Sequence, residues 1–338
     1  MKIQTLLLIA LACCPSVAVA ASPVSAPALR IATVAPAGSS FHKQLLALGA
    51  EWSKGPGGVR MDVYPGTQGG ESQIVRRLRI GQIQGAMLTV VGLADIDRSV
   101  TALQYMPMMF RDWHEVDIAR DRVRVDLERR LESAGYVLLF WGDAGWVRYF
   151  SNRPVRRPAD LLPMRVFAST GEQESVQMLS TYYKPVPLDP DKLLLGLRNG
   201  MIDAVPMPAF LANFSQVPSY APYMLDLKWS PIVGALVISK PVWDALDSPT
   251  RDWLRVTSER AGHAIRAASR AQDDAAIVAM RDRQGLTVTT LTPQELEEWR
   301  VAVTAAYPAI RERLVPADTF DQVVSALAAH RAALGTPR

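Results

Sequence analysis

The stretch LRIATVAPAGSSFHKQLLALGAEWSKGPGGVRMDVYP (residues 29–65) predicts a strand, a helix and a second strand in succession. Its first six residues form an apolar run typical of a buried strand, which a proline and a glycine end. Apolar residues then recur at intervals of three and four over 41–52, so a helix is expected there with Ser39 or Ser40 as its cap. After a glycine-rich turn, alternation over 59–64 predicts the second strand.

The same alternation of strands and helices continues along the chain. A helix over 71–80 and a strand over 85–91 extend the first series, which favours a parallel sheet covered by helices. A helix over 113–135 and a strand over 136–142 follow. A second series begins near Arg148, with these elements expected: strands 164–167, 184–188 and 202–205, helices 171–180 and 191–199, and a strand 231–239 that returns to the first sheet.

A long run without helix breakers covers residues 251–283, capped by Ser248 or Thr250 and ended by Gly285. It exceeds the length of most globular helices, so we expect it to bridge two domains. Two α/β series crossed by the chain predict a cleft between two sheets. Ligands of such folds bind at the carboxyl ends of strands and at the domain interface.

Composition excludes several classes of protein. The 338 residues suffice for two domains, and 49% hydrophobic with 21% charged residues indicates a globular chain. The net charge of +4 comes from scattered basic residues, so nucleic-acid binding is not expected.

The first twenty residues predict a signal peptide. Lys2 precedes an apolar run, and Ala18-Val19-Ala20 supplies a small-x-small cleavage site, so we expect an exported, periplasmic protein cleaved near Ala20. Both cysteines, Cys13 and Cys14, would leave with this peptide. The alternative, a lipoprotein that keeps one of them, is disfavoured by the residues ahead of Cys13. No later stretch predicts a transmembrane helix.

No motif for catalysis or metal binding is evident. The sequence has no G-x-S-x-G, P-loop or G-x-G-x-x-G, and after processing no cysteine. The four histidines lack neighbours at metal-ligand spacing, so neither a metal nor a cofactor is expected: His42, His114, His263 and His330. We therefore do not expect an enzyme.

Arg165 is the most informative candidate for a binding residue. It interrupts an apolar segment, Met164-Arg165-Val166-Phe167, that we expect to be a buried strand. A guanidinium there is costly to desolvate unless an anion meets it, and its planar fork suits a carboxylate. An interdomain ion pair is the alternative interpretation.

Six segments together resemble one known family, the DctP-type periplasmic solute-binding proteins of tripartite ATP-independent periplasmic (TRAP) transporters. They are similar to the family's blocks in order and spacing and cover roughly Leu29 to Leu314: Val63–Glu71, Leu78–Gln84, Met106–Arg111, Arg148–Val155, Asp160–Val166 and Leu197–Ala204.

The resemblance implies a two-lobed, periplasmic binding protein-like α/β fold whose lobes a long helix joins. It further implies a small organic acid as ligand and the small and large TRAP membrane subunits as partners. The arginine at the position of Arg165 is the family's usual carboxylate anchor, and the one at the position of Arg148 often adds a second contact.

Departures from the family pattern favour one class of acid. Met207 stands where many members have an asparagine that contacts the ligand, and Val34 and Thr89 replace polar pocket residues of some sugar-acid binders. Such walls leave several hydroxyls unpaired, so a monocarboxylate with an apolar body is expected, ahead of a C4-dicarboxylate. Three aromatic residues are further candidates for the wall, each with core packing as the alternative: Trp146, Phe167 and Trp229.

The expected organisation is discontinuous. We assign the chain as follows: signal peptide 1–20, lobe I 27–145 with 232–268, lobe II 146–231 with 269–320, and a C-terminal helix or tail 321–338. Three alternatives to a TRAP receptor remain at this point, namely the binding protein of an ATP-driven transporter, a periplasmic sensor and, with least support, an α/β enzyme.

Overall fold

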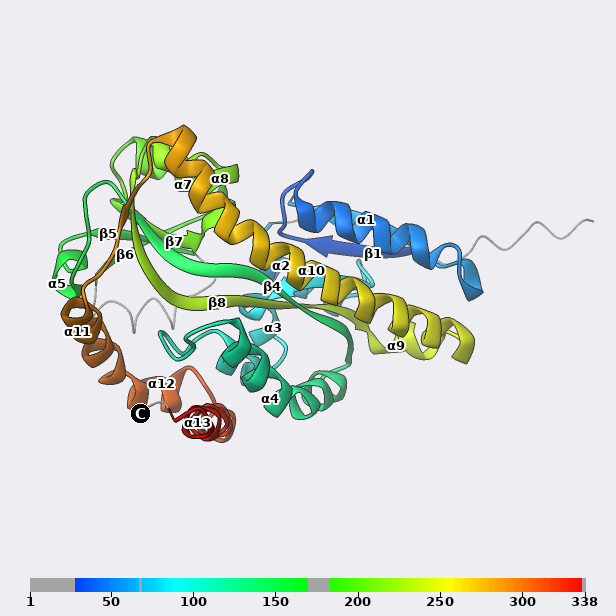
Figure 1. Ribbon diagram of the computed structural model, residues 1–338. Helices are drawn as coiled ribbons and strands as arrows, with labels where there is room; N and C mark the ends of the chain where they lie inside the picture. The colour runs from blue at the N-terminus through cyan, green and yellow to red at the C-terminus, as the bar shows by residue number, and fades with distance from the viewer. Residues whose placement is uncertain (1–27, 67–68, 170–182, 336–338) are drawn as a thin grey trace, which may run out of the picture.

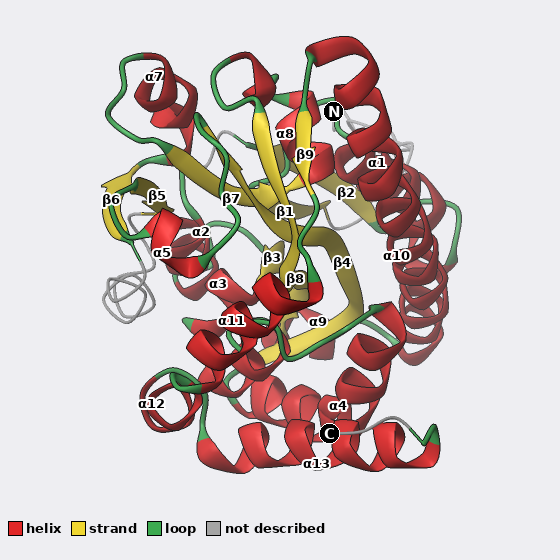
Figure 2. Cartoon of the chain, turned by 60° about the vertical axis from the view of Figure 1, so that its left-hand side comes forward, coloured by secondary structure: helices red, strands yellow, loops and turns green. Residues whose placement is uncertain are grey.

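The structure, a computed structural model, describes residues 28–66, 69–169 and 183–335. The predicted signal peptide and the predicted helix 171–180 lie outside these residues. The described strands form one sheet in the order β2-β1-β3-β8-β4-β7-β5-β6, and β9 pairs with β8 (Figures 1 and 2).

The strands are β1 (Ala28–Thr33), β2 (Arg60–Pro65), β3 (Gly85–Thr89), β4 (Tyr136–Ser151), β5 (Arg165–Ser169), β6 (Lys184–Leu188), β7 (Ala204–Pro208), β8 (Tyr223–Ser239) and β9 (Thr287–Thr289). The α-helices are α1 (Ser40–Trp52), α2 (Glu71–Arg79), α3 (Val90–Ala94), α4 (Trp113–Ser133), α5 (Pro158–Leu161), α7 (Leu193–Arg198), α8 (Ala209–Phe214), α9 (Lys240–Asp244), α10 (Ser248–Gln284), α11 (Pro293–Thr304), α12 (Tyr307–Arg313) and α13 (Ala317–Ala333). Four short 3-10 helices are η1 (Pro56–Gly58), η2 (Arg98–Leu103), η3 (Pro190–Lys192) and η4 (Val217–Ser219).

The first β-α-β-α-β series is confirmed. β1 pairs in parallel with both β2 and β3, as the alternation of strands and helices predicts. The Ser39 hydroxyl caps α1 by accepting from the backbone N–H of His42. β3 ends two residues earlier than expected because Thr89, its last residue, also caps α3 with its hydroxyl.

The prediction of two separate sheets is wrong. β4 and β8, of 16 and 17 residues, pair antiparallel along most of their length. They run through both halves of one continuous sheet: the first half contains β1, β2 and β3, and the second contains β5, β6, β7 and β9. The apolar pattern of β4 does not stop at Gly142, as expected from the glycine, but continues through a β-bulge. The pairing register shifts between Asp143 and Trp146, where Gly145 has a φ of 91°.

Both faces of this sheet are covered by apolar side chains. In the first half, Val137 belongs to the core cluster beneath α1 and α10, while the adjacent Leu138 belongs to the cluster beneath α4 and α13. In the second half, Phe150 and its neighbour Tyr149 likewise belong to different clusters. Successive side chains of a strand point to opposite faces of the sheet, so the two core clusters in each half lie on opposite faces.

α10 is the long helix that the sequence predicts, and it runs along the sheet past both halves (Figure 1). Its 37 residues span roughly 55 Å at 1.5 Å per residue. It packs against β4, against α1 of the first half and against α8 of the second. Asp247, rather than Ser248 or Thr250, is its N-cap, and Gly285 ends it with a φ of 68°.

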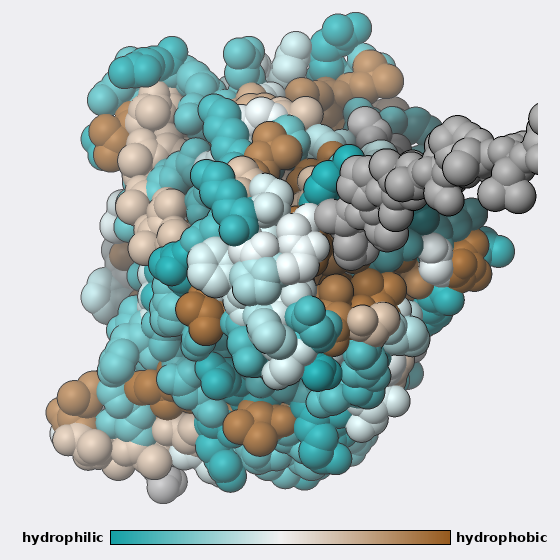
Figure 3. Space-filling view, turned by 90° about the vertical axis from the view of Figure 1, so that its right-hand side faces the viewer, coloured by the Kyte–Doolittle hydropathy of each residue, from teal (hydrophilic) through white to brown (hydrophobic). Residues whose placement is uncertain are grey.

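The last helix returns to the first half of the molecule. α13 packs on α4 and contributes Phe320, Val323 and Leu327 to the core there. On the face shown in Figure 3, apolar side chains form small separate groups among hydrophilic ones. No helix in the described ranges is both long and apolar enough to cross a membrane.

Candidate functional site

The predicted site residues lie on six strands or at their ends. Thr89 closes β3 and Val34 follows β1 in the first half of the sheet. The other six are in the central strands and the second half: Trp146 and Arg148 in β4, Arg165 and Phe167 in β5, Met207 in β7 and Trp229 in β8.

Arg165 is not enclosed in an apolar strand, contrary to the expectation. It is the first residue of β5, and 46% of its side chain is exposed. Its Nε and Nη2 donate to the two carboxylate oxygens of Asp203 at 3.0 and 2.9 Å, and its backbone N–H donates to Oδ2 at 2.9 Å. The side chain therefore begins the strand at its solvent-facing end, held by a carboxylate 38 residues away.

Asp203 is fixed as firmly as the arginine that it holds. Its Oδ1 also accepts from the side-chain amide of Asn152 at 3.1 Å. The Arg165 guanidinium lowers the pKa of the Asp203 carboxyl from 3.8 to about 2, so this carboxylate is ionised at neutral pH. Because Asp203 engages the Nε edge of the guanidinium, the edge formed by Nη1 and Nη2 retains donors suited to a second carboxylate.

Arg148 occupies the opposite kind of environment. Only 3% of its side chain is exposed, and its Nη1 donates to Asp273 of α10 at 2.8 Å. Asp273 also accepts backbone N–H groups from Trp146 and Phe210, so one carboxylate joins β4, α8 and the long helix. The Nε of Arg148 is buried without a hydrogen bond among the described residues, with Asp226 at 3.7 Å its nearest further ion-pair partner.

Met207 and Phe167 belong to one apolar surface in the second half. Met207 lies opposite Arg148 in the β4–β7 register, and it is buried. Phe167 of β5 is half-buried and packs against the same cluster. Of the two, Met207 is the strand neighbour of the buried arginine.

Thr89 is bound to a buried acid that the sequence interpretation missed. Its hydroxyl donates to Glu71 at 2.8 Å and accepts from the backbone N–H of Val91, so its hydrogen is already used. Glu71 also accepts from the backbone N–H groups of Thr89 and Gly92. Burial raises the pKa of Glu71, although these hydrogen bonds oppose the shift. Val34, beyond β1, is partly exposed and offers only an aliphatic side chain.

The two tryptophans are parts of the cores. Trp146 packs against Trp113 of α4, with ring centroids 4.7 Å apart. Trp229 packs edge to face against Tyr149 and Trp299. Trp229 therefore lies on the face of β4 occupied by Tyr149, and the structure does not bring it together with Arg148.

No group of three or more histidine, cysteine, aspartate or glutamate residues within the described ranges could hold a metal ion. A groove between α4 and α10 is lined by none of the eight predicted site residues.

Comparisons with known proteins agree with this architecture. The model of a family described as bacterial extracellular solute-binding protein, family 7 (DctP), matches residues 31–313. The chain is 20% identical over 278 residues to the C4-dicarboxylate-binding periplasmic protein DctP of Rhodobacter capsulatus, covering 80% of this chain and 82% of that one.

Solved structures show the same fold. A TRAP periplasmic solute-binding protein of Ralstonia eutropha with bound acetolactate has a TM-score of 0.82 at 19% identity and covers 89% of this chain and 99% of its own. An extracytoplasmic solute receptor of Bordetella pertussis that binds pyroglutamic acid has a TM-score of 0.81 at 18% identity, with the same coverage. A protein of Shewanella oneidensis with bound succinate has a TM-score of 0.81 at 14% identity, also over 89% and 99% of the two chains.

Proposed function

The chain belongs to family 7 of the bacterial extracellular solute-binding proteins, and from this premise we propose that it is a TRAP receptor for a monocarboxylate with an apolar body. The fold is that of two-lobed TRAP periplasmic binding proteins. The ligand would lie between the two halves of the sheet, with Arg165 holding its carboxylate.

The observation that carries this proposal is the orientation of Arg165. A guanidinium bound along one edge by Asp203 cannot rotate freely, so its other edge is preorganised for a bidentate contact. The side chain is also accessible, which a docking ligand requires. In this interpretation the ion pair with Asp203 positions the anchor rather than replacing the ligand.

Arg148 is proposed as a polar contact for a part of the ligand remote from its carboxylate. Arg148 lies opposite Met207, whereas Arg165 is held at Asp203, four residues earlier in the chain and roughly 13 Å away along the strands. The buried Nε of Arg148 makes no hydrogen bond to any described residue, the nearest carboxylate oxygen being that of Asp226 at 3.7 Å, and leaving a buried donor unpaired costs about 1–3 kcal/mol. A ligand oxygen that reaches this nitrogen would recover part of that cost. The main role of the side chain remains its ion pair with Asp273.

The remaining walls favour an apolar ligand body over a polyhydroxylated one. Met207, Phe167 and Val34 offer no polar atoms to sugar hydroxyls, and the Thr89 hydroxyl already donates to Glu71. Structurally similar proteins bind acids as different as acetolactate, pyroglutamate, galacturonate and succinate, so the fold alone does not select among them. It is the apolar side chains of Met207, Phe167 and Val34 that favour a monocarboxylate with an apolar body.

Ligand binding would be coupled to closure of the two halves. Ring centroids of Phe41 in α1 and Phe210 in α8 lie 5.6 Å apart, and the Ser40 hydroxyl donates to Gln272 of α10. The ring contact joins elements of different halves, and the hydrogen bond joins α1 to the helix that runs past both. The closed form would then present the acid to the small and large membrane subunits, after export to the periplasm and removal of residues 1–20.

The test is calorimetric titration of the mature chain with a panel of monocarboxylates and dicarboxylates. Arg165→Ala is expected to weaken binding of the preferred acid at least about a hundredfold, the loss of a bidentate charged contact. Arg156→Ala is the matched control, because Arg156 is also 46% exposed and also forms a two-pronged ion pair, with Glu295. Equal affinity of the Arg165→Ala and unmodified chains, or a preference for a neutral solute, would refute the proposal.

A further inference from the structure

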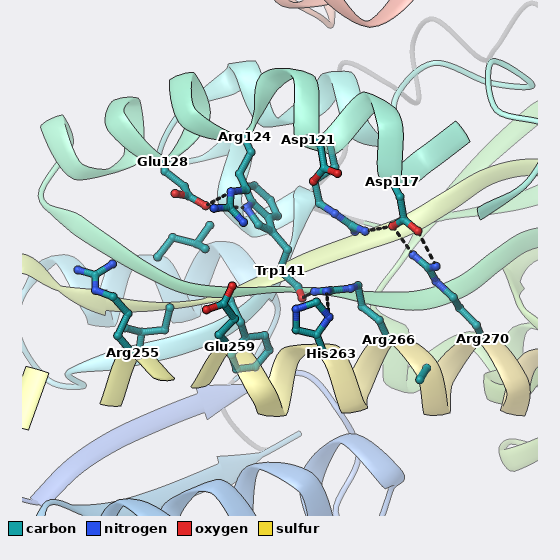
Figure 4. A pocket seen from close by; sticks show the side chains of 15 residues that line it. Asp117, Asp121, Arg124, Glu128, Trp141, Arg255, Glu259, His263, Arg266 and Arg270 are labelled. Atoms are coloured by element: carbon teal, nitrogen blue, oxygen red, sulfur yellow. Dashed lines mark hydrogen bonds and ion pairs between the residues drawn. The ribbon is translucent and has the colours of Figure 1, made fainter. Parts of the chain in front are cut away.

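A groove with a volume of about 530 Å³ lies between α4 and α10, apart from the proposed ligand site (Figure 4). Its floor is the first part of β4, including Leu139 and Trp141, and its walls are the facing surfaces of the two helices. Charged side chains project from both walls toward one another. Such a groove is a binding site only if some of its charges lack partners.

At one end of the groove, two arginines and two aspartates neutralise one another. Arg120 and Arg270 both bind Asp143, whose side chain is fully buried, at 2.6–2.8 Å. The same two arginines also bind Asp117. These four side chains carry no net charge.

Arg266 is the third arginine at this end, and it forms no ion pair with any acid in the part of the chain that the structure describes. Its Nη1 donates to the backbone oxygen of Trp141 at 2.6 Å, and its Nη2 contacts Nδ1 of His263 at 2.8 Å. Neither partner is a carboxylate. Burial, together with the charges of Arg120 and Arg270, lowers the pKa of Arg266 despite the nearby aspartates. Arg266 is therefore a half-buried guanidinium without an ion-pair partner among the described residues.

His263 adds a donor beside this charge. A guanidinium has only hydrogens to offer, so the contact with Arg266 makes Nδ1 the acceptor and places the imidazole proton on Nε2. His263 is exposed and lines the groove, one helical turn from Arg266. The pair thus offers an anion a guanidinium and an imidazole N–H on one helix face.

The rim limits the charge that the groove accepts. Glu259 lies one turn from His263 on α10, and Asp121 and Glu128 project from α4. Glu259 and Asp121 take part in no ion pair among the described residues, whereas Glu128 is paired with Arg124 at 3.5 Å. Two free carboxylates within the same groove repel a dianion more strongly than a monoanion.

We propose that the groove between α4 and α10 is a second binding site, which holds a singly charged oxyanion such as a carboxylate against Arg266 and His263. An anion there would be held by α10, the helix that runs past both halves, on the face turned toward α4. The site is independent of the acid bound at Arg165, because none of its lining residues belongs to that site.

The indole N–H of Trp141 is a local reporter, since it lies in the groove and contacts Glu128 at 3.3 Å. Its resonance is followed in a ¹H–¹⁵N spectrum of the mature Arg165→Ala chain while sodium acetate or sodium sulfate is added in a zwitterionic buffer. The resonance is assigned by its disappearance in the Trp141→Phe variant. Using the Arg165→Ala chain separates this test from the proposed cleft. We expect a saturable shift with acetate, and at equal ionic strength a smaller or non-saturable one with sulfate.

Three variants complete the design. Arg266→Gln should weaken acetate binding at least about tenfold, and exposed His263→Ala, which removes no core contact, about two- to fivefold. Arg260→Gln is the matched control on α10, because Arg260 pairs with Glu51 of α1 and does not line the groove. The absence of saturation with acetate, tighter binding of sulfate, or unchanged acetate binding in both the Arg266 and His263 variants would overturn the proposal.

Discussion

Replacing Asp203 by asparagine removes the charge that holds Arg165. The carboxyl pKa of Asp203 falls from 3.8 to about 2 in the folded protein, which is equivalent to about 2 kcal/mol of favourable interaction. Because 46% of the Arg165 side chain is exposed, solvent screens the pair, and we expect Asp203→Asn to lower the free energy of unfolding by about 1 kcal/mol at pH 7.

The pH dependence has a definite sign. A folded-state pKa below the unfolded value stabilises the protein fully at pH values above 3.8. This stabilisation disappears as the pH falls toward about 2, so the difference between the two proteins should shrink to about half at pH 3.

Urea denaturation followed by circular dichroism at pH 7 and pH 3 measures both quantities. Glu297→Gln is the control, because Glu297 forms an exposed ion pair with Arg300 at 3.5 Å and should contribute less than about 0.5 kcal/mol. The same Asp203→Asn protein should bind the acid ligand about tenfold more weakly, since Arg165 loses its fixed orientation. Equal stability at pH 7, or a difference that does not change with pH, would refute the role assigned to Asp203.

Three further perturbations test other parts of the account. Met207→Asn places an amide in an apolar cluster, so it should lower the free energy of unfolding in denaturant by about 2 kcal/mol. The same variant should shift the ligand preference measured by calorimetry toward hydroxylated acids, and an unchanged preference would contradict the role of Met207 in specificity. Gly145→Ala adds a Cβ 2.6 Å from Oδ1 of Asp273 at a residue whose φ is 91°. Calorimetric melting should therefore show a free energy of unfolding lower by about 1–2 kcal/mol, and unaltered melting would exclude strain at this bulge. Burial raises the pKa of Glu71 above 4.5, so the contribution of this side chain to the free energy of unfolding is greatest below pH 4.5 and declines as the pH rises through the raised value. Glu71→Gln should abolish that decline in unfolding titrations between pH 4 and 8. A decline that persists in the variant would show that another group is responsible.

Local patterns in the sequence were sufficient to predict most of the first half. The apolar spacing of α1, the cap at Ser39 and the breaker-free run of α10 are properties of neighbouring residues, and the structure confirms each of them.

Features that depend on distant residues were not predicted. The length of β4 depends on pairing with β8, about ninety residues further along the chain, so Gly142 looked like the end of a strand. Arg165 looked like a buried arginine because its flanking residues are apolar, but its environment is set by Asp203. Glu71 resembles an ordinary acid in the first turn of a helix, and only the approach of Thr89 and Gly92 makes it a buried acceptor.

The central claim is that Arg165 grips the carboxylate of the ligand. A crystal structure of the mature chain with its tightest-binding monocarboxylate tests it most directly. The account predicts both carboxylate oxygens within hydrogen-bonding distance of the Nη1–Nη2 edge, with Asp203 still on the Nε edge. An acid bound elsewhere, with Arg165 in contact with Asp203 alone, would contradict it.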